Sequence, residues 1–154
     1  MKFVPVPITG GQRVLFSVWE TRVQDYEVFA KEAKREWPHP GIPQEPTHPA
    51  GMVSWDDAQA FCAWLTQRER KAGKLNANEM VRLPSDHEWS CAVGIGERED
   101  AAKIPHGNYS WIKGVIGGHR DRFVETAPVG SFAANRYGLY DLGGNVGGVV
   151  RGLV

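Results

Sequence analysis

The spacing of apolar side chains predicts three helices in the first two thirds of the chain. The first begins near Thr21, and Glu27 and Lys31 are spaced for an ion pair on its polar side. Its apolar face consists of Val23, Tyr26, Phe29, Ala30 and Ala33. Pro38 and Pro40 are expected to end this helix, because proline cannot continue one.

Two capping patterns mark the other helices. Ser54 followed by Asp57 predicts a helix start, with an apolar stripe formed by Ala58, Phe61, Cys62 and Leu65. Gly73 is placed to end that helix. Ser85 followed by Glu88 predicts a short third helix, in which Trp89 and Ala92 are the first buried residues.

After Gly96 the sequence becomes rich in glycine and aromatic residues, with short apolar pieces that suggest strands and loops. Helices followed by short strands predict an α+β fold, in which the helices near Val23 and Ala58 pack on a small, twisted, antiparallel sheet. The predicted core includes Trp55, Phe61, Leu65, Trp89 and Leu139.

Length and charge narrow the functional classes. The 154 residues suit a single domain, 1–154. Lys and Arg total 18 and so do Asp and Glu, so no basic excess points to nucleic acid or an anionic membrane. No apolar run is long enough to span a membrane, and the N-terminal prolines and glycines do not form a secretory segment, so a cytoplasmic location is expected.

Common catalytic motifs are absent, and the cysteines do not form a metal framework. No nucleophile elbow, phosphate loop or paired-histidine zinc motif occurs. Cys62 and Cys91 are either buried thiols or one disulfide bridge. His87 is expected to be an exposed or capping residue.

Oxygen-bearing side chains are the more informative group. In the glycine-rich part they are Asn108, Asp121, Asn135, Asp141 and Asn145. Side-chain and carbonyl oxygens in such loops can converge on calcium. The same residues are ordinary turn formers, so the residue types leave both interpretations open.

Three blocks of sequence, in order, resemble the formylglycine-generating enzyme and sulfatase-modifying-factor family, and bacterial members most of all. They read MVSWDDAQAFCAWL, VRLPSDHEWSCAVG and DRFVETAPVGSFAANRYGLYDLGGNV, and FSVWETRVQDYEVF resembles an earlier block. The resemblance runs from about Phe16 to Val146. It implies a variant of the C-type lectin fold.

The resemblance also implies two calcium sites. The first would use Asn108 and Asp121 with the carbonyls of Tyr109 and Phe123. The second would use Asp141, Gly144 and Val146, but Gly148 stands where the family has a glutamate. The first site therefore looks intact, whereas the second has lost a carboxylate.

One departure from the family bears on catalysis. Gly147 and Gly148 replace a Trp-Glu pair, and the chain ends soon after, before the region that supplies the two copper-binding cysteines in the oxidases. Cys62 and Cys91 do not align with those cysteines. Copper is therefore expected only if the chain is an oxidase.

Two functions follow from the resemblance. The first is a non-catalytic, calcium-stabilised module that presents loops to a protein or small ligand, as variable proteins of diversity-generating retroelements do. The alternative is a formylglycine-generating oxidase, or a fragment of one, acting on a sulfatase cysteine. The shortened end also predicts self-association, or a partner strand, at the edge formed by Tyr140 to Val154.

Overall fold

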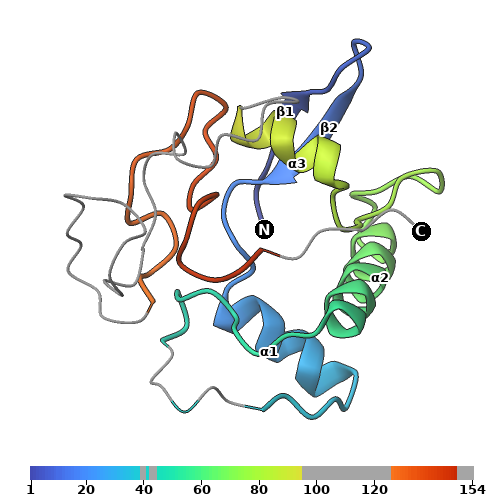
Figure 1. The fold of residues 1–154 in the computed structure, drawn as a ribbon. Coiled ribbons are helices and arrows are strands. Elements are labelled where there is room, and N and C mark those ends of the chain that lie inside the picture. The colour runs from blue at the N-terminus through green and yellow to red at the C-terminus, as the bar shows by residue number, and fades with distance from the viewer. Residues whose placement is uncertain (39–40, 42–44, 95–125, 149–154) are drawn as a thin grey trace.

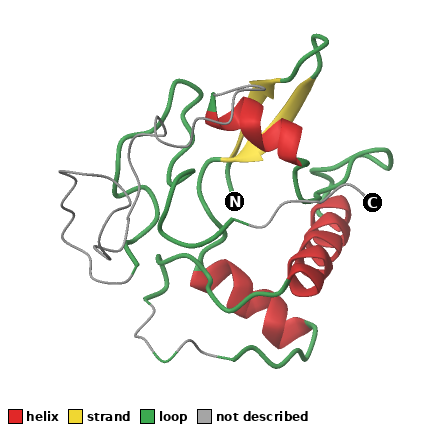
Figure 2. Ribbon diagram, viewed as in Figure 1, coloured by secondary structure: helices red, strands yellow, loops and turns green. Residues whose placement is uncertain are grey.

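The computed structural model describes residues 1–38, 41, 45–94 and 126–148. Two strands and three helices occur in this part of the chain, giving an α+β fold (Figure 1 and Figure 2). In chain order they are β1 (Phe3–Pro7), β2 (Arg13–Ser17), α1 (Val23–Glu32), α2 (Trp55–Lys71) and α3 (Asp86–Val93). No helix among these residues is long and apolar enough to cross a membrane.

The described sheet lies at the N-terminus, and of the region after Gly96, where strands were expected, residues 97–125 and 149–154 lie outside the described part of the chain. β1 and β2 pair antiparallel, with Val6 opposite Val14, and residues 126–148 contain no strand. The amides of Ile8 and Val18 bond across the hairpin ends, to Gln12 and Lys2. Even-numbered residues of β1 therefore face β2 with their amides, and Pro5 and Pro7 fall on the outer edge, where a missing N–H costs no ladder bond.

The turn of this hairpin depends on two glycines. Gly10 and Gly11 have φ of 88° and 80°, a left-handed conformation that glycine adopts without steric cost. Ile8 N–H closes the turn by donating to Gln12 O at 2.8 Å. The pattern of apolar residues alone did not reveal this hairpin, because prolines and glycines dominate it.

The first helix forms as predicted but ends before the prolines. α1 ends at Glu32, and Lys34 adopts a left-handed φ of 51°. Arg35 N–H then donates back to Ala30 O at 2.9 Å, which satisfies a terminal carbonyl. The expectation that Pro38 and Pro40 end the helix is therefore wrong, since a backbone reversal ends it first.

Both predicted capping boxes are present. The Ser54 hydroxyl accepts a hydrogen bond from Asp57 N, and the Ser85 hydroxyl accepts one from Glu88 N. Gly73, with φ of 70°, follows the C-terminus of α2 as predicted. These short-range signals fixed the boundaries of α2 and α3 because they act within four residues.

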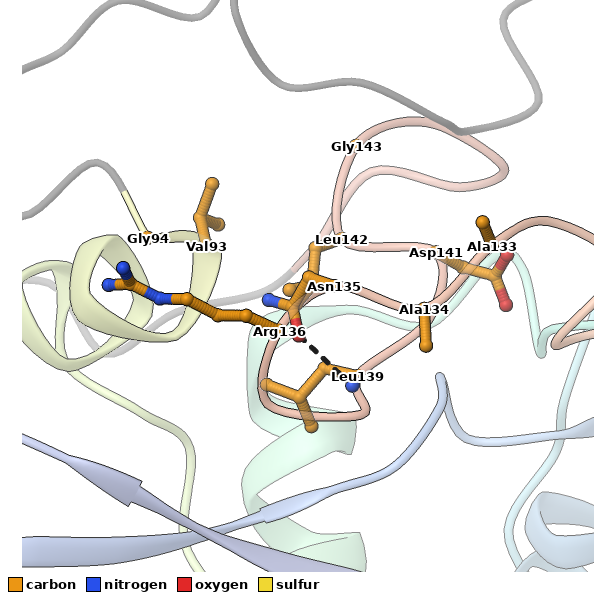
Figure 3. A pocket seen from close by; sticks show the side chains of 10 residues that line it. All are labelled: Val93, Gly94, Ala133, Ala134, Asn135, Arg136, Leu139, Asp141, Leu142 and Gly143. Carbon is orange, nitrogen blue, oxygen red and sulfur yellow. Dashed lines mark hydrogen bonds between the residues drawn. The ribbon is translucent and has the colours of Figure 1, made fainter.

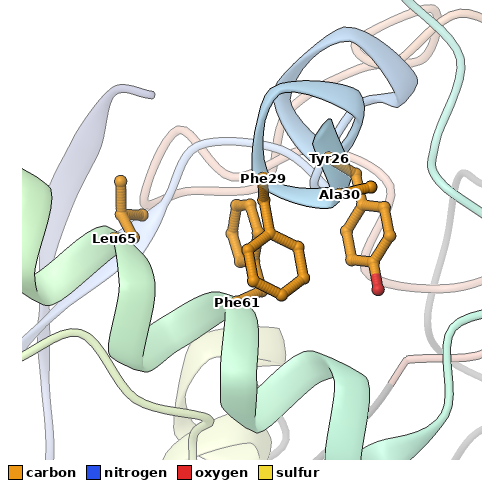
Figure 4. Close-up of a cluster of buried hydrophobic side chains, with 5 residues drawn as sticks. All are labelled: Tyr26, Phe29, Ala30, Phe61 and Leu65. Carbon is orange, nitrogen blue, oxygen red and sulfur yellow. The ribbon is translucent and has the colours of Figure 1, made fainter. Parts of the chain in front are cut away.

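An aromatic cluster joins α1 and α2 (Figure 4). Its buried members are Tyr26, Phe29, Ala30, Phe61 and Leu65. The rings of Phe29 and Phe61 meet edge to face, with centroids 5.6 Å apart, an arrangement that favours aromatic packing. Phe61 and Leu65 are buried as predicted, but Trp55 is 42% exposed, because it is the first residue of α2 and lies off the apolar stripe.

A second, smaller cluster joins the hairpin to α3 and to the segment 126–148. It consists of Val6, Ala92 and Leu139, which are at most 2% exposed. The burial predicted for Leu139 is thus confirmed, whereas Trp89 is only half-buried. Tyr140 N–H adds a backbone bond to Val18 O at 2.9 Å, so the C-terminal segment is fixed against the end of the hairpin.

Candidate functional site

The residues predicted to bind calcium fall in two parts of the chain. Asn108, Tyr109, Asp121 and Phe123, the first predicted site, lie outside the described residues. Asp141, Gly144 and Val146, the second predicted site, are described and lie in one loop. The geometry of that loop is the basis for the candidate site.

Asp141 is a buried carboxylate with one oxygen left unpaired. The residue is 5% exposed and adopts a left-handed φ of 57°. Its Oδ2 accepts a hydrogen bond from Gly130 N at 2.6 Å, while its Oδ1 has no partner among the described residues. Burial raises the pKa of Asp141 despite the Gly130 bond. An unpaired buried oxygen of this kind is costly unless a proton or a cation reaches it.

The loop that follows Asp141 turns through further left-handed residues. Gly144 has φ of 102° and Asn145 has φ of 65°. Aspartate and asparagine are the side chains that tolerate this region best, so their presence suits the turn. The backbone conformation thus accounts for the residue types at 141 and 145 independently of any ligand.

The other two described oxygen-bearing candidates use their side chains in structural bonds. Asn145 Oδ1 accepts from Ala127 N at 2.8 Å, and its Nδ2 donates to Glu20 Oε2 at 2.9 Å. Asn135 Oδ1 accepts from the backbone amides of Tyr137 and Leu139. Asn135 and Asn145 therefore act as turn formers, and Asp141 differs from them in having a free oxygen.

Glu20 brings a second acidic group to this loop. Its Oε1 accepts from Val146 N at 3.3 Å, in addition to the Asn145 bond. Burial, and then the charge of Asp141, raise the pKa of Glu20 to about 8, although these two hydrogen bonds oppose the shift. Glu20 is absent from the predicted ligands because it is distant in sequence. Its place in the FSVWETRVQDYEVF block was the signal that could have found it.

This arrangement fits a hard cation chemically. The charge of buried Asp141 disfavours the charged form of half-buried Glu20, and a divalent ion would remove that conflict. No group of three or more His, Cys, Asp or Glu side chains occurs within the ranges described. The remaining ligands would therefore be backbone carbonyls, as predicted for Gly144 and Val146, and water.

A shallow cavity of about 350 Å³ opens between the end of α3 and this loop (Figure 3). Arg136 and Asp141 lie at opposite ends of its lining. The Arg136 side chain extends toward Gly94, at the negative end of α3, where a guanidinium is favoured. It also donates to the Tyr137 hydroxyl at 2.6 Å. The cavity can therefore offer the guanidinium of Arg136 to a small polar group, whereas the unpaired oxygen of Asp141 is buried.

The two cysteines are free and lie on different helices. Of the two possibilities left open by the sequence, a disulfide bridge is thus excluded. Cys62 in α2 is half-buried, and burial raises the pKa of its thiol to about 11. Cys91 in α3 is half-buried beside exposed His87. These residues do not fit the pair of adjacent thiolates that a copper centre of the oxidase type would need.

The hairpin, the three helices and the tethered C-terminal loop define an α+β protein of the sulfatase-modifying-factor fold. The structure of PvdO from Pseudomonas aeruginosa superposes with a TM-score of 0.63, covering 92% of this chain and 63% of that one at 19% identity. This likeness establishes the fold.

The sequence comparisons establish the family. Residues 6–151 match the Sulfatase-modifying factor enzyme 1-like domain, and the chain belongs to that family. It is 37% identical over 123 residues to the formylglycine-generating enzyme of Thermomonospora curvata, covering 72% of this chain and 35% of that protein. It is 35% identical over 119 residues to inactive C-alpha-formylglycine-generating enzyme 2 of Bos taurus, covering 71% and 34%. The chain thus spans about a third of the length of these relatives.

Proposed function

We propose that this protein is a non-catalytic binding module of the sulfatase-modifying-factor family, stabilised by calcium. The supporting observation is the setting of its two cysteines. They lie on separate helices, and the Cys62 thiol keeps its proton at neutral pH because burial raises its pKa to about 11. Nucleophilic attack by Cys62 would need the thiolate, and a copper centre of the oxidase type would need two adjacent thiolates, which cysteines on separate helices do not supply.

Sequence similarity to the relatives does not distinguish a catalytic from a non-catalytic protein, so the distinction depends on the residues of the site. The bovine relative named inactive is 35% identical, and the Thermomonospora enzyme is 37% identical. These values differ too little to favour catalysis or its absence. The alternative, a formylglycine-generating oxidase or a fragment of one, has no additional support from the described geometry.

Calcium would act as a structural ion in this proposal. The first site would use Asn108, Tyr109, Asp121 and Phe123, as the family resemblance implies. The second is supported by the unpaired oxygen of Asp141 and by the nearby carboxyl group of Glu20, which a bound cation would favour in its charged form. Bound calcium would neutralise these carboxylates and hold the loop against the end of the hairpin.

Ligand binding would use the loop surface around the cavity of Figure 3, whose lining includes Arg136. Arg136 donates a hydrogen bond to the hydroxyl of the next residue, Tyr137. The ligand would be a protein segment or a small polar molecule, and the module would act in the cytoplasm as one domain, 1–154. Self-association, or a partner strand near Tyr140 to Val154, is part of the same proposal. Nucleic acid and membranes are not expected partners, since the formal net charge is zero.

Two experiments test the proposal. In the first, calcium added after chelation should raise the melting temperature, because an ion that binds only the folded state stabilises it. Asp121→Ala should reduce this rise if calcium binds at the first site, and Asp141→Asn should reduce it if calcium binds at the second. If both variants bind calcium as the native chain does, both assignments are wrong.

The second experiment measures oxygen consumption with copper and a cysteine-containing sulfatase peptide. We expect no turnover from the purified chain, with the Thermomonospora relative as the positive control. Turnover that depends on Cys62 or Cys91 would overturn the non-catalytic proposal.

A further inference from the structure

A thiol and an imidazole face each other on α3, away from the loop discussed above. His87 and Cys91 are one helical turn apart, and His87 Nε2 lies 3.8 Å from Cys91 Sγ. Residues four apart lie on the same face of a helix, so their side chains meet. His87 is exposed and Cys91 half-buried, so solvent and solutes reach the pair.

The separation of the two atoms matches the bite of a tetrahedral metal ion. Zinc binds sulfur at about 2.3 Å and imidazole nitrogen at about 2.0–2.1 Å, which places the two ligand atoms roughly 3.6 Å apart at a tetrahedral angle. The observed 3.8 Å differs by an amount that a small side-chain rotation covers. The ligand types are also suitable, because zinc and similar ions prefer thiolate and imidazole to carboxylate alone.

The helix that carries the pair is fixed at both ends. The Ser85 hydroxyl and the Glu88 carboxylate form the capping box at its start, and Arg82 pairs with Glu88 through its two terminal guanidinium nitrogens, at 2.7 and 2.6 Å. Ala92 is fully buried against the hairpin cluster. The spacing of His87 and Cys91 is therefore set by a rigid helix, which reduces the entropy lost on binding an ion.

From this geometry we propose that His87 and Cys91 form a two-residue site for a zinc-like transition-metal ion. It is independent of the calcium sites and of the proposed binding function. No third His, Cys, Asp or Glu joins the pair within the described ranges, so water completes the coordination shell. On binding, the Cys91 thiol loses its proton to solvent as the metal–sulfur bond forms, and the hydrated ion keeps only the waters that complete a tetrahedral shell and releases the others.

The site can be tested with Co²⁺, whose bond to a thiolate gives a charge-transfer absorption in the near ultraviolet. We expect a saturable absorption at one ion per chain, displaced by Zn²⁺. Cys91→Ser should abolish the band, and His87→Ala should weaken binding at least tenfold. Cys62→Ser is the matched control and should bind as the native chain does, because Cys62 is on α2 and keeps its proton.

Alkylation gives a second measurement. Zn²⁺ should slow the modification of Cys91 by iodoacetamide, read by mass spectrometry, and His87→Ala should remove that protection. Far-ultraviolet circular dichroism checks that the variants keep their helices.

Three results would overturn the proposal. The first is the absence of a saturable cobalt–thiolate band. The second is metal binding that His87→Ala leaves unchanged, and the third is a stoichiometry of one ion per two chains. The last would mean that two molecules share the ion, so the pair on one helix is not a site by itself.

Discussion

Three polar residues of the C-terminal loop show how chemically similar side chains come to differ in role. Asn135 and Asn145 use their side-chain oxygens to accept backbone hydrogen bonds. Asp141 uses one oxygen and leaves the other unpaired. Glycine-rich sequence with scattered Asn and Asp is compatible with turns and with cation ligands, and only the three-dimensional partners separate the two.

Asp141→Asn tests the charge conflict at this loop. When a chelator has removed calcium, Glu20 takes up a proton as the protein folds, because its pKa is raised from 4.5 in the unfolded chain to about 8 in the folded state. The folded state then binds more protons than the unfolded state between those pH values, so stability falls as pH rises from 4.5 to 8. Removing the Asp141 charge should flatten this fall.

We expect Asp141→Asn to be more stable than the native chain at pH 8 in chelator, because it replaces a buried carboxylate by a neutral amide of nearly the same shape. Urea denaturation at pH 5 and pH 8 measures the difference. Equal slopes with pH in the two proteins would show that Asp141 does not act on Glu20.

At the scale of elements, the helices and the presence of a small antiparallel sheet could be predicted from sequence, whereas the position of the described hairpin could not. The capping boxes of α2 and α3 depend on residues within four positions of each other, and both are present. In the hairpin, residues 5 and 7 of β1 face away from β2 on the backbone side, so prolines are tolerated at both positions. The apolar pattern of the sequence does not show this direction. The end of α1 was not predicted correctly. The backbone reverses at Lys34, which adopts a left-handed φ, and a lysine in the sequence does not indicate such a conformation.

The start of α3 should be sensitive to acid. The paired Arg82 guanidinium, together with the Ser85 amide, lowers the pKa of Glu88 to about 2. A lowered carboxyl pKa contributes stability that is present above the unfolded value of 4.5 and is lost as pH falls toward 2. Glu88→Gln keeps a cap acceptor without the charge and should lose this acid dependence, at a cost of at most about 1 kcal/mol at neutral pH.

Thermal melting at pH 2 to 6 measures this effect. Arg82→Lys is the matched variant, because lysine keeps the charge but not the two-pronged pairing; its acid transition should move to higher pH. Identical acid transitions in all three proteins would show that another group controls the loss.

The small cluster of Val6, Ala92 and Leu139 should control the stability of the β1–α3 region. Leu139 is 2% exposed and belongs to the same buried cluster as Val6 of β1 and Ala92 of α3. Leu139→Ala should therefore lower the free energy of unfolding by about 2–5 kcal/mol, through lost burial and the cavity left behind. Leu15, 63% exposed, is the control, and Leu15→Ala should change stability by less than about 0.5 kcal/mol. Urea denaturation measures both, and a small effect at Leu139 would mean that the loop does not support the hairpin.

At the scale of the whole molecule, the edges of the hairpin determine how it can associate. In the described sheet, the outer edge of β1 lacks two N–H donors at Pro5 and Pro7, which hinders pairing with another strand. Pro5→Thr restores one donor and should increase concentration-dependent association, measured by light scattering. Leu15→Thr leaves both prolines in place and should not increase it; a monodisperse Pro5→Thr protein would contradict the role given to the prolines.

The contacts between the two ends of the described chain also have a consequence for folding during synthesis. Val6 is covered by Leu139, Val18 is bonded to Tyr140, and Glu20 is bonded to Asn145, 125 positions further on. A ribosome must therefore translate most of the sequence before the N-terminal hairpin can bury its apolar face. Until then α1 and α2 can pair locally through their aromatic rings, while the hairpin remains a substrate for chaperones.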